Sequence, residues 1–183
     1  MTTTTARRVG DQTAIPMALM RGGTSRGPMF LASDLPSDVQ QRDQVLLAVM
    51  GSPHPLQVDG VGGGHSLTSK AGIVAPSERD DIDLDFTFVQ LQPEATTVQT
   101  TQNCGNMLAA VVPFAVERGL IQPTQDVTDV VVRTTNTGLI SRIGVHTPAA
   151  HGQRYVQYSG DAEIAGVPGT ASPVNIRLLN TAG

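Results

Sequence analysis

The feature that most constrains this 183-residue chain is the apolar run MLAAVVPFAV at residues 107–116. A helix that is apolar on every side is buried inside a protein rather than laid on its surface. The rest of the chain must therefore surround this segment. Pro113 should remove one backbone hydrogen bond and bend the helix, and Gly119 should end it.

Segments that resemble strands lie on both sides of this run and can supply the surrounding layer. Apolar residues alternate with polar ones over 83–91, and Asn136, Thr137 and Gly138 predict a hairpin turn between two later strands. The expected strands span residues 15–20, 28–32, 73–74, 83–91, 96–100, 127–134, 139–146, 154–158 and 174–179. This pattern predicts an α+β fold in which an antiparallel, barrel-like sheet wraps around a central buried helix.

A second helix is expected over residues 38–50. Ser37 and Gln40 have the spacing of a capping box, and the Gly-Ser-Pro sequence at 51–53 stops the helix. The side of this helix that faces the core is expected to carry Val39, Leu46, Leu47 and Met50.

Composition excludes several classes of function. Charged residues make up 15% of the chain and the formal net charge is -4, so a nucleic-acid-binding surface is not expected. No apolar run reaches the ~18–20 residues that span a bilayer, so no membrane contact is expected. The single cysteine excludes a disulfide framework and a multi-cysteine zinc site. The histidines show no ligand spacing, so no metal site is predicted.

The two ends of the chain differ in character. Residues 1–13 are polar, lack the apolar core of a secretory signal and are expected to form a disordered N-terminal tail. With no export signal and a lone thiol, a cytoplasmic location is the default expectation. The other end, a predicted strand at 174–179 followed by a turn, is typical of an interrupted protein.

The lone cysteine directly precedes the buried helix, in the sequence QNCGN at 102–106. Helix N-termini stabilise thiolates and offer free N–H groups to anions. Asn103 and Asn106 can hydrogen-bond a substrate, and Gly105 would let a ligand approach the backbone. Cys104 is therefore a candidate catalytic residue. The alternative is a buried structural cysteine with Asn103 acting only as the helix cap.

A glycine run precedes the only lysine of the chain, in the sequence GGGHSLTSK at 62–70. Consecutive glycines expose N–H groups and the hydroxyls that follow add donors, which suits a carboxylate or phosphate. The spacing does not match a Walker A loop. Lys70 borders apolar strand residues, where loss of hydration favours a role as a base. The alternative is a solvated lysine in a flexible loop. The candidate binding residues here are Gly64, Ser66, Thr68 and Ser69.

A third loop, RGGTSRG at 21–27, joins two short strands, and we expect a hairpin with a wide functional loop. Its arginines flank a Gly-Thr-Ser turn and predict a carboxylate clamp, because guanidinium groups pair with carboxylates through two hydrogen bonds. The alternative is an ordinary charged hairpin. The candidate binding residues here are Arg21, Gly22, Gly23, Thr24, Ser25 and Arg26.

Together the three loops describe a pocket with many N–H and hydroxyl donors, two arginines, one thiol and one amine. Such a pocket suits a small polyanionic acid and proton transfer at carbon without a cofactor. In this order, MRGGTSRG, DGVGGGHSLTSKAGIV and QNCGNM resemble the PrpF-like isomerases of the diaminopimelate epimerase and proline racemase superfamily. The sequences LLAVMGSPHPLQVDG and PFAVERGLI are similar to the 4-oxalomesaconate tautomerase branch of this family.

This resemblance covers residues 14–183 and implies a diaminopimelate epimerase-like fold of two similar domains with the active site between them. Family members are about twice as long, so residues 14–183 would be the N-terminal domain. A second epimerase-like domain would be its partner, with a homodimer left open. By position, Cys104 matches a proton-transfer cysteine, Lys70 a lysine considered catalytic, and Ser25 part of a carboxylate-binding hairpin.

Two positions depart from the family pattern, because Arg26 stands where lysine is frequent and His65 where an acidic or small residue is frequent. The implied reaction is cofactor-independent keto–enol tautomerisation of 4-oxalomesaconate by 1,3-proton transfer, in the catabolism of gallate- or protocatechuate-type aromatic compounds. Alternatives are cis–trans isomerisation of 2-methylaconitate or aconitate, a methylitaconate delta-isomerase, or an inactive half that serves only as a binding domain. An isolated half should leave Lys70 hydrated and be weakly active or inactive.

Overall fold

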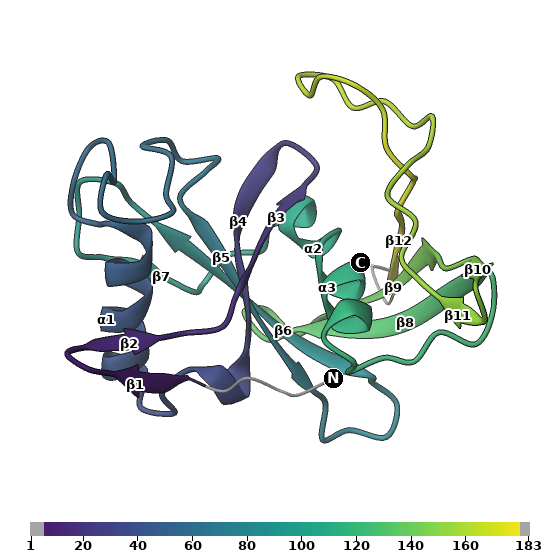
Figure 1. Ribbon diagram of the computed structural model, residues 1–183, viewed down its shortest axis with the longest axis horizontal. Coiled ribbons are helices and arrows are strands. Elements are labelled where there is room, and N and C mark those ends of the chain that lie inside the picture. Colours follow the sequence, from purple (N-terminus) through teal and green to yellow (C-terminus); the bar gives the residue numbers. More distant parts are fainter. Residues whose placement is uncertain (1–5, 180–183) are drawn as a thin grey trace.

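In the computed structural model, which describes residues 6–179, eight strands form one curled sheet (Figure 1). They are β3 (Ala18–Gly22), β4 (Ser25–Leu31), β5 (Lys70–Pro76), β6 (Leu84–Leu91), β7 (Val98–Gln99), β8 (Val127–Thr134), β9 (Leu139–His146) and β12 (Asn175–Leu179). Their order is β12–β9–β8–β6–β5–β4–β3, and the short β7 pairs with β6 outside this row. The expected α+β fold, with a sheet curled around a buried helical segment, is confirmed.

The prediction of a wholly antiparallel sheet is wrong. β4 pairs with β5 and β6 pairs with β8 in parallel. A parallel pair requires a long crossover connection, and each crossover here contains helix. The helices are α1 (Val39–Met50), α2 (Gly105–Leu108) and α3 (Val111–Glu117). The first parallel pair also brings the starts of β4 and β5 side by side, which matters for the site.

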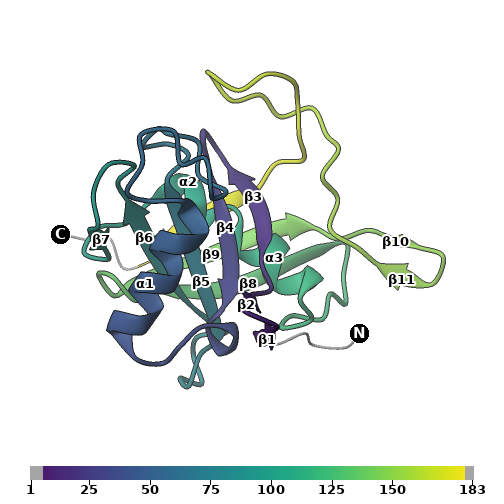
Figure 2. The same cartoon turned by 60° about the vertical axis from the view of Figure 1, so that its left-hand side comes forward.

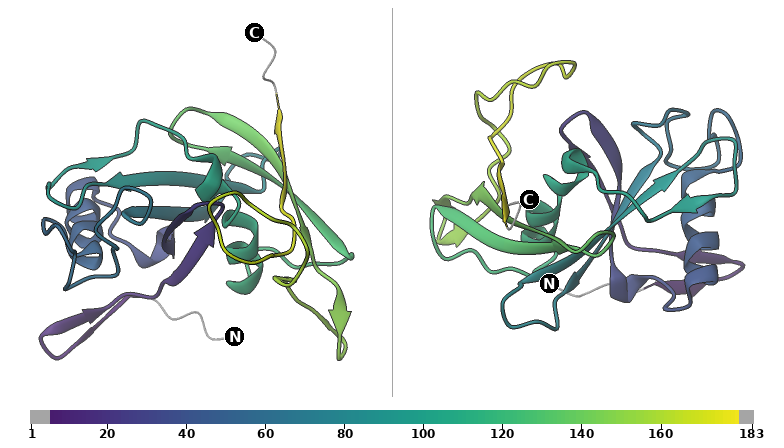
Figure 3. Two further views of the ribbon diagram at one scale, coloured as in Figure 1. Left: turned by 90° about the horizontal axis from the view of Figure 1, so that it is seen from above. Right: turned by 180° about the vertical axis from the view of Figure 1, so that it is seen from behind.

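The apolar run is buried, as predicted, but it forms two short helices instead of one. α2 and α3 are separated at Ala109 and Ala110. Pro113 explains the interruption, because it has no N–H to donate to the carbonyl of Ala109, four residues earlier. Gly119 follows α3 with a φ of 76°, the left-handed conformation that ends a helix. Figure 3 shows the sheet curled around both helices. The buried residues of this core include Met29, Phe86, Phe88, Met107, Val111 and Phe114.

The other face of the sheet is covered by α1 (Figure 2). Its cap is Asp38 and not Ser37, because the Asp38 carboxylate accepts a hydrogen bond from the Gln41 backbone N–H at 2.9 Å. A carboxylate also complements the positive end of the helix dipole. Val39, expected to face the core, is 59% exposed, and burial is confined to the later turns. The buried residues of this second core are Phe30, Leu35, Leu46, Met50, Ala71, Ile73, Val89 and Leu91.

The expected disordered tail is replaced, over residues 7–14, by an exposed hairpin. β1 (Arg7–Val9) pairs with β2 (Gln12–Ala14), and Gly10 supplies a φ of 64° at the turn. A two-residue turn with a left-handed glycine is typical of short hairpins. Residues 1–5 of the predicted tail lie outside the described residues. After η1, a single 3-10 turn (Ala32–Asp34), the chain enters α1.

The strand expected at 154–158 is wrong over most of its length. β11 (Gln153–Arg154) is limited to its start and pairs with β10 (Ala149–Ala150), and residues 155–158 are not in a strand. Residues 159–173 then form an arm that stands away from the body on the same side as the tip of the β3–β4 hairpin (Figures 1 and 2). Tyr158, at the base of the arm, donates a hydrogen bond to Glu117 at 2.6 Å.

Candidate functional site

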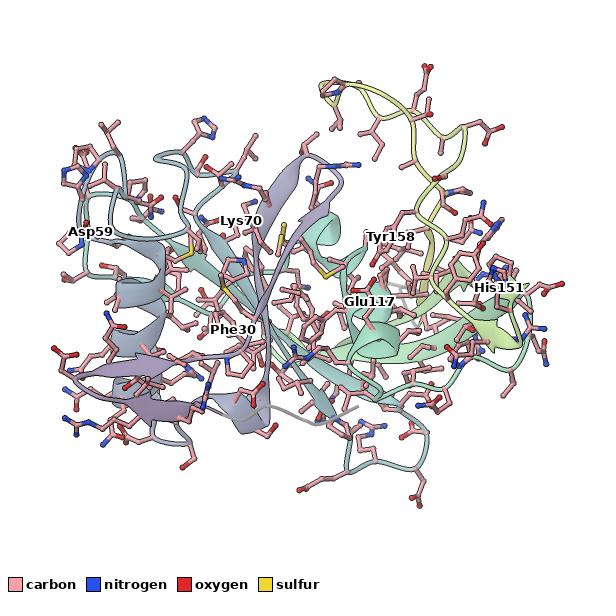
Figure 4. The ribbon with its side chains drawn as sticks, in the orientation of Figure 1. Phe30, Asp59, Lys70, Glu117, His151 and Tyr158 are labelled. Atoms are coloured by element: carbon pink, nitrogen blue, oxygen red, sulfur yellow. The ribbon has the colours of Figure 1, made fainter. Side chains whose placement is uncertain are left out.

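Three side chains from separate elements meet where β4 and β5 begin. Ser25 is the first residue of β4, Lys70 is the first residue of β5, and Cys104 directly precedes α2. Lys70 Nζ donates to Ser25 Oγ at 3.1 Å and to Cys104 Sγ at 3.5 Å. Ser25 Oγ lies 3.9 Å from the same sulfur. Figure 4 shows Lys70 beside the β3–β4 hairpin, on its side nearer the glycine-rich loop. We call these three side chains the Lys70 cluster.

The backbones of β4 and β5 approach each other closely at this end of the sheet. A Cβ on Gly27 would collide with the carbonyl oxygen of Lys70, so only glycine fits there. Side chains alternate between the two faces of a strand, so Ser25 and Gly27 share the face that packs on α2 and α3. The close approach therefore places the Ser25 hydroxyl directly beside the Lys70 amine.

The hairpin formed by β3 and β4 is also attached to α2. A Cβ on Gly22 would collide with the carbonyl oxygen of Asn106, whose side-chain amide donates to Thr24 Oγ1 at 2.9 Å. Gly22 pairs with Ser25, which leaves a turn of only two residues. The wide functional loop predicted here is therefore a tight hairpin, pressed against the helix that follows the cysteine.

The Lys70 amine is enclosed by this chain alone. Lys70 is 8% exposed, and its amine lies 5.7 Å from the centroid of the Phe88 ring. Within residues 6–179 no carboxylate pairs with it. The expectation that Lys70 would stay hydrated without a second half is therefore wrong. A buried charge requires a partner, and here a charged amine could be balanced only by the Cys104 thiolate or by an anionic ligand.

Cys104 is partly exposed and occupies the N-cap position of α2 without a side-chain cap. Asn103, the alternative cap, instead donates to Thr137 Oγ1 at 2.6 Å. Because α2 has only four residues, the helix dipole contributes less here than a single long helix would. Gly105 has no atom within 4 Å of its Cβ position, so its backbone is open to a ligand. Cys104 is thus partly open to a ligand, and the basic side chain that contacts its sulfur is Lys70.

The glycine loop, residues 59–69, uses much of its hydrogen-bonding capacity inside the protein. The N–H of Gly62 donates to the Met50 carbonyl at 3.3 Å. The N–H of Gly64 donates to the side-chain oxygen of Gln57 at 3.0 Å. Two of the three N–H donors predicted to form an open anion nest therefore already have protein partners.

Two hydroxyl groups of the same loop form hydrogen bonds within the protein, and a third is exposed. Ser69 is fully buried and donates to Gln57 at 2.8 Å, and Thr68 donates to the His65 carbonyl at 3.2 Å. Ser66 remains exposed. Because Ser69 immediately precedes the site lysine, this loop supports the Lys70 cluster more than it offers donors to a ligand.

Two buried glutamines, which the sequence analysis missed, hold the glycine loop in place. Gln57 is 1% exposed, and its side-chain oxygen accepts hydrogen bonds from the Gly64 N–H and the Ser69 hydroxyl. The Gln90 amide donates to the carbonyls of Ser69 and Ser66 at 3.0 and 3.2 Å. A glutamine near the end of the otherwise apolar half of β6 is the signal that could have found it, because a buried amide needs partners.

The two arginines of the hairpin lie on the other face of the sheet. Arg21 pairs directly with Arg26, and strand alternation points both away from the face that carries Ser25. Arg21 donates to the Gly23 carbonyl at 2.7 Å. The Arg26 guanidinium lies against the glycine loop, 2.9 Å from the Cβ position of Gly63. The predicted clamp residues are adjacent to each other, but the structure does not bring them to the Lys70 cluster.

A hollow of about 350 Å³ lies between the hairpin, the buried helices and the base of the arm. Its lining includes Arg21, Gly22, Gly23, Gly105 and Asn106, which border the site, but none of the Lys70 cluster. Tyr158 also lines it, and burial together with the hydrogen bond to Glu117 raises the pKa of this phenol above its usual range. The chemistry therefore lies beside this hollow and not inside it.

Within the described chain, no three His, Cys, Asp or Glu side chains are grouped so that they could hold a metal ion. None of the helices over residues 6–179 is long and apolar enough to cross a membrane.

An amine, a hydroxyl and a thiol in mutual contact on a curled α+β sheet are suited to acid–base chemistry on a small molecule. Comparison with known proteins identifies the family. Residues 12–183 match the family model described as PrpF protein, and the chain belongs to this family.

Several relatives have stated activities. The chain is 48% identical over 177 residues to a (4E)-oxalomesaconate Delta-isomerase of Novosphingobium sp. (strain KA1), covering 97% of this chain and 48% of that protein. It is 50% identical over 172 residues to a 4-oxalomesaconate tautomerase of Pseudomonas putida, covering 94% and 46%. The crystal structure of a methylitaconate-delta-isomerase superposes with a TM-score of 0.82 at 40% identity, covering 88% and 41%. The chain spans about half the length of the curated relatives it matches.

Proposed function

We propose that this chain carries the proton-transfer site of a cofactor-independent tautomerase that acts on 4-oxalomesaconate, a small unsaturated tricarboxylate. The contact of 3.5 Å between Lys70 Nζ and Cys104 Sγ is the observation that carries the proposal. Relatives named for oxalomesaconate are 48% and 50% identical to this chain. A 3-methylitaconate isomerase of Eubacterium barkeri and a 2-methyl-aconitate isomerase of Cupriavidus necator are 40% and 38% identical. The difference favours oxalomesaconate over these two alternatives.

The reaction requires a base that removes a proton from a carbon next to a carbonyl and an acid that returns a proton at the other end of the conjugated system. Lys70 and Cys104 together supply one acid and one base, whether they are an amine and a thiol or an ammonium and a thiolate. With an amine and a thiol, Lys70 is the base; with an ammonium and a thiolate, Cys104 is the base. After one turnover the two have exchanged roles, and proton transfer across their direct contact restores the starting state.

Binding of the substrate carboxylates is assigned to the donors that border the Lys70 cluster. The backbone of Gly105 and the amides of Asn103 and Asn106 lie on the same helix end as the thiol, and each amide has a second N–H besides the one given to a threonine. In the dienolate, negative charge spreads onto the carbonyl oxygen, where positioned N–H donors stabilise it. Arg21, which also lines the hollow beside the site, and Arg26, which lies against the glycine loop, remain predicted contacts for a carboxylate that reaches past the edge of the hairpin.

The relatives are about twice as long, which supports a second domain as the partner that closes this site. We infer that the enzyme works in the reducing cytoplasm, where a lone active thiol stays reduced.

The test is a substrate panel followed by the absorbance of the keto and enol forms. Because Lys70 is already buried by this chain alone, we now expect activity where the sequence predicted an inactive half. Incubated with 4-oxalomesaconate, the chain should accelerate the approach to keto–enol equilibrium, with weaker turnover of methylitaconate and 2-methylaconitate. Preferential turnover of either alternative acid would reassign the substrate. No turnover of any of the three would leave the binding-domain alternative as the better description.

A further inference from the structure

We propose that Ser25 is a positioning residue that joins the Lys70 amine and the Cys104 thiol into one proton-transfer unit. This inference rests on the proposed function and assigns Ser25 a role different from the carboxylate contact that the family resemblance implies. The three polar atoms form a triangle with sides of 3.1, 3.5 and 3.9 Å.

The hydrogen-bonding capacity of a serine hydroxyl matches this place. Such a group has one donor and two acceptor sites. Ser25 Oγ accepts a hydrogen bond from the Lys70 amine, which leaves its own hydrogen free to point at the Cys104 sulfur. It thereby restricts the rotation of the amine and adds a donor to the thiolate. No net proton passes through Ser25, so the two-residue exchange proposed above stays balanced.

The location of Ser25 is fixed from two directions. Ser25 is 0% exposed, whereas Cys104 is partly exposed. On one side Gly27 presses β4 against the start of β5, and on the other Gly22 presses β3 against α2. The hairpin is therefore a wedge between the strand that carries the amine and the helix that follows the thiol.

Burial also distinguishes between Ser25 as a positioning residue and Ser25 as a contact for a substrate carboxylate. A residue that binds a substrate carboxylate must present its hydroxyl to the ligand, yet this hydroxyl is enclosed and directed at two protein groups. Cys104 is partly exposed and Ser25 is not, so the cysteine is the member of this pair that a small molecule can approach. Ser25 thus acts through its neighbours.

The first readout is kinetic. Ser25→Ala should lower kcat for 4-oxalomesaconate by about 10- to 100-fold while KM changes by less than about threefold, because misalignment of reacting groups affects the transition state more than binding. Ser141→Ala is the matched control, since Ser141 is equally buried and its hydroxyl has no hydrogen-bond partner within the described chain. A Ser25→Ala variant that keeps full kcat would overturn the proposal.

The second readout does not depend on turnover, so it separates failure of this inference from failure of the proposed function. Cys104 is the only cysteine, so loss of the free thiol during treatment with iodoacetamide reports on this residue alone. Thiolates, not thiols, are alkylated, and the ratio of the rates at about pH 7 and about pH 10 cancels differences in access. Ser25→Ala and Lys70→Met should each lower this ratio by about threefold or more, and Ser141→Ala should not.

A hydroxyl restored at the same place completes the test. Ser25→Thr should return both kcat and the alkylation ratio towards those of the parent. If its melting temperature shows that the added methyl group is not tolerated, the comparison of Ser25→Ala with Ser141→Ala decides alone. An alkylation ratio in Ser25→Ala equal to that of the parent refutes the linkage, whether or not the chain is found to turn over oxalomesaconate.

Discussion

The two faces of the sheet at the β3–β4 hairpin carry basic side chains in different surroundings. On one face a single basic side chain, Lys70 of the neighbouring β5, is buried against a hydroxyl and a thiol. On the other, Arg21 and Arg26 lie side by side, with Arg21 exposed. Charge alone would favour the arginines as the site of a polyanion. Enclosure and contact favour Lys70, because buried groups are held in fixed geometry and interact in a lower dielectric.

The largest expected effect separates the two faces by activity. Lys70→Met and Cys104→Ala should each reduce kcat/KM for oxalomesaconate by about 10³-fold, within the range found for general acid–base groups. Arg26→Met, the matched cation replacement on the other face, should act mainly on KM and by less than about tenfold. Steady-state kinetics of the three variants measures the contrast. If Arg26→Met costs as much as Lys70→Met, the assignment of chemistry to the enclosed face fails.

The next effect concerns the backbone contact that builds the enclosed face. Gly27→Ala should lower the free energy of unfolding by about 3 kcal/mol, because the added methyl group meets the Lys70 carbonyl and neither backbone can yield cheaply. Gly105→Ala is the control, since nothing lies within 4 Å of its Cβ position. Urea denaturation of both variants provides the test, and equal midpoints would contradict the close approach.

A smaller effect should follow loss of the amide beneath the glycine loop. Gln57→Ala leaves the Gly64 N–H and the Ser69 hydroxyl without their acceptor and should lower the free energy of unfolding by about 2 kcal/mol. Gln44→Ala, on the exposed side of α1, is the matched control and should change it by less than about 0.5 kcal/mol. Hydrogen exchange would show whether the loss of protection is centred on residues 59–69, as the contacts require.

The smallest effect lies outside both faces, at the base of the arm. Tyr158→Phe removes one hydrogen bond from a half-exposed ring and should cost about 0.5 kcal/mol at neutral pH. Burial and Glu117 raise the pKa of Tyr158, so above its ordinary value of 10.0 the unfolded chain loses this proton first. The parent should therefore lose stability above pH 10 relative to Tyr158→Phe. Melting temperatures of the two proteins, measured side by side above pH 10, test this. If the phenol is not held protonated, the difference between them will not change with pH.

The alternation of apolar and polar residues along the sequence predicted much of this fold. The strands at 127–134 and 139–146 match β8 and β9 residue for residue, because alternation and a left-handed Gly138 define both strands and their turn. The buried helical run was also evident from its composition. The parallel pairs were not, since their partners are separated by whole helices and no local signal sets their register.

For the candidate site, the residue types could be predicted but not their directions. Lys70 and Cys104 stood out as the only members of their kind, and the structure brings them into contact. That Arg21 and Arg26 face away follows from a two-residue turn, which the Gly-Thr sequence allows but does not require. Gln57 and Gln90 act only through tertiary contacts, so their sequence neighbours carried little sign of their role.

The spacing of the site residues along the chain has a consequence for folding kinetics. Ser25, Lys70 and Cys104 are separated by 45 and 34 positions, so each of their contacts closes a long loop of chain. Long-range contacts must overcome the entropy of loop closure and form slowly. A partly folded intermediate would therefore hold its thiol apart from its amine. The onset of paired reactivity at Cys104 during refolding should mark the docking of α2 against the starts of β4 and β5.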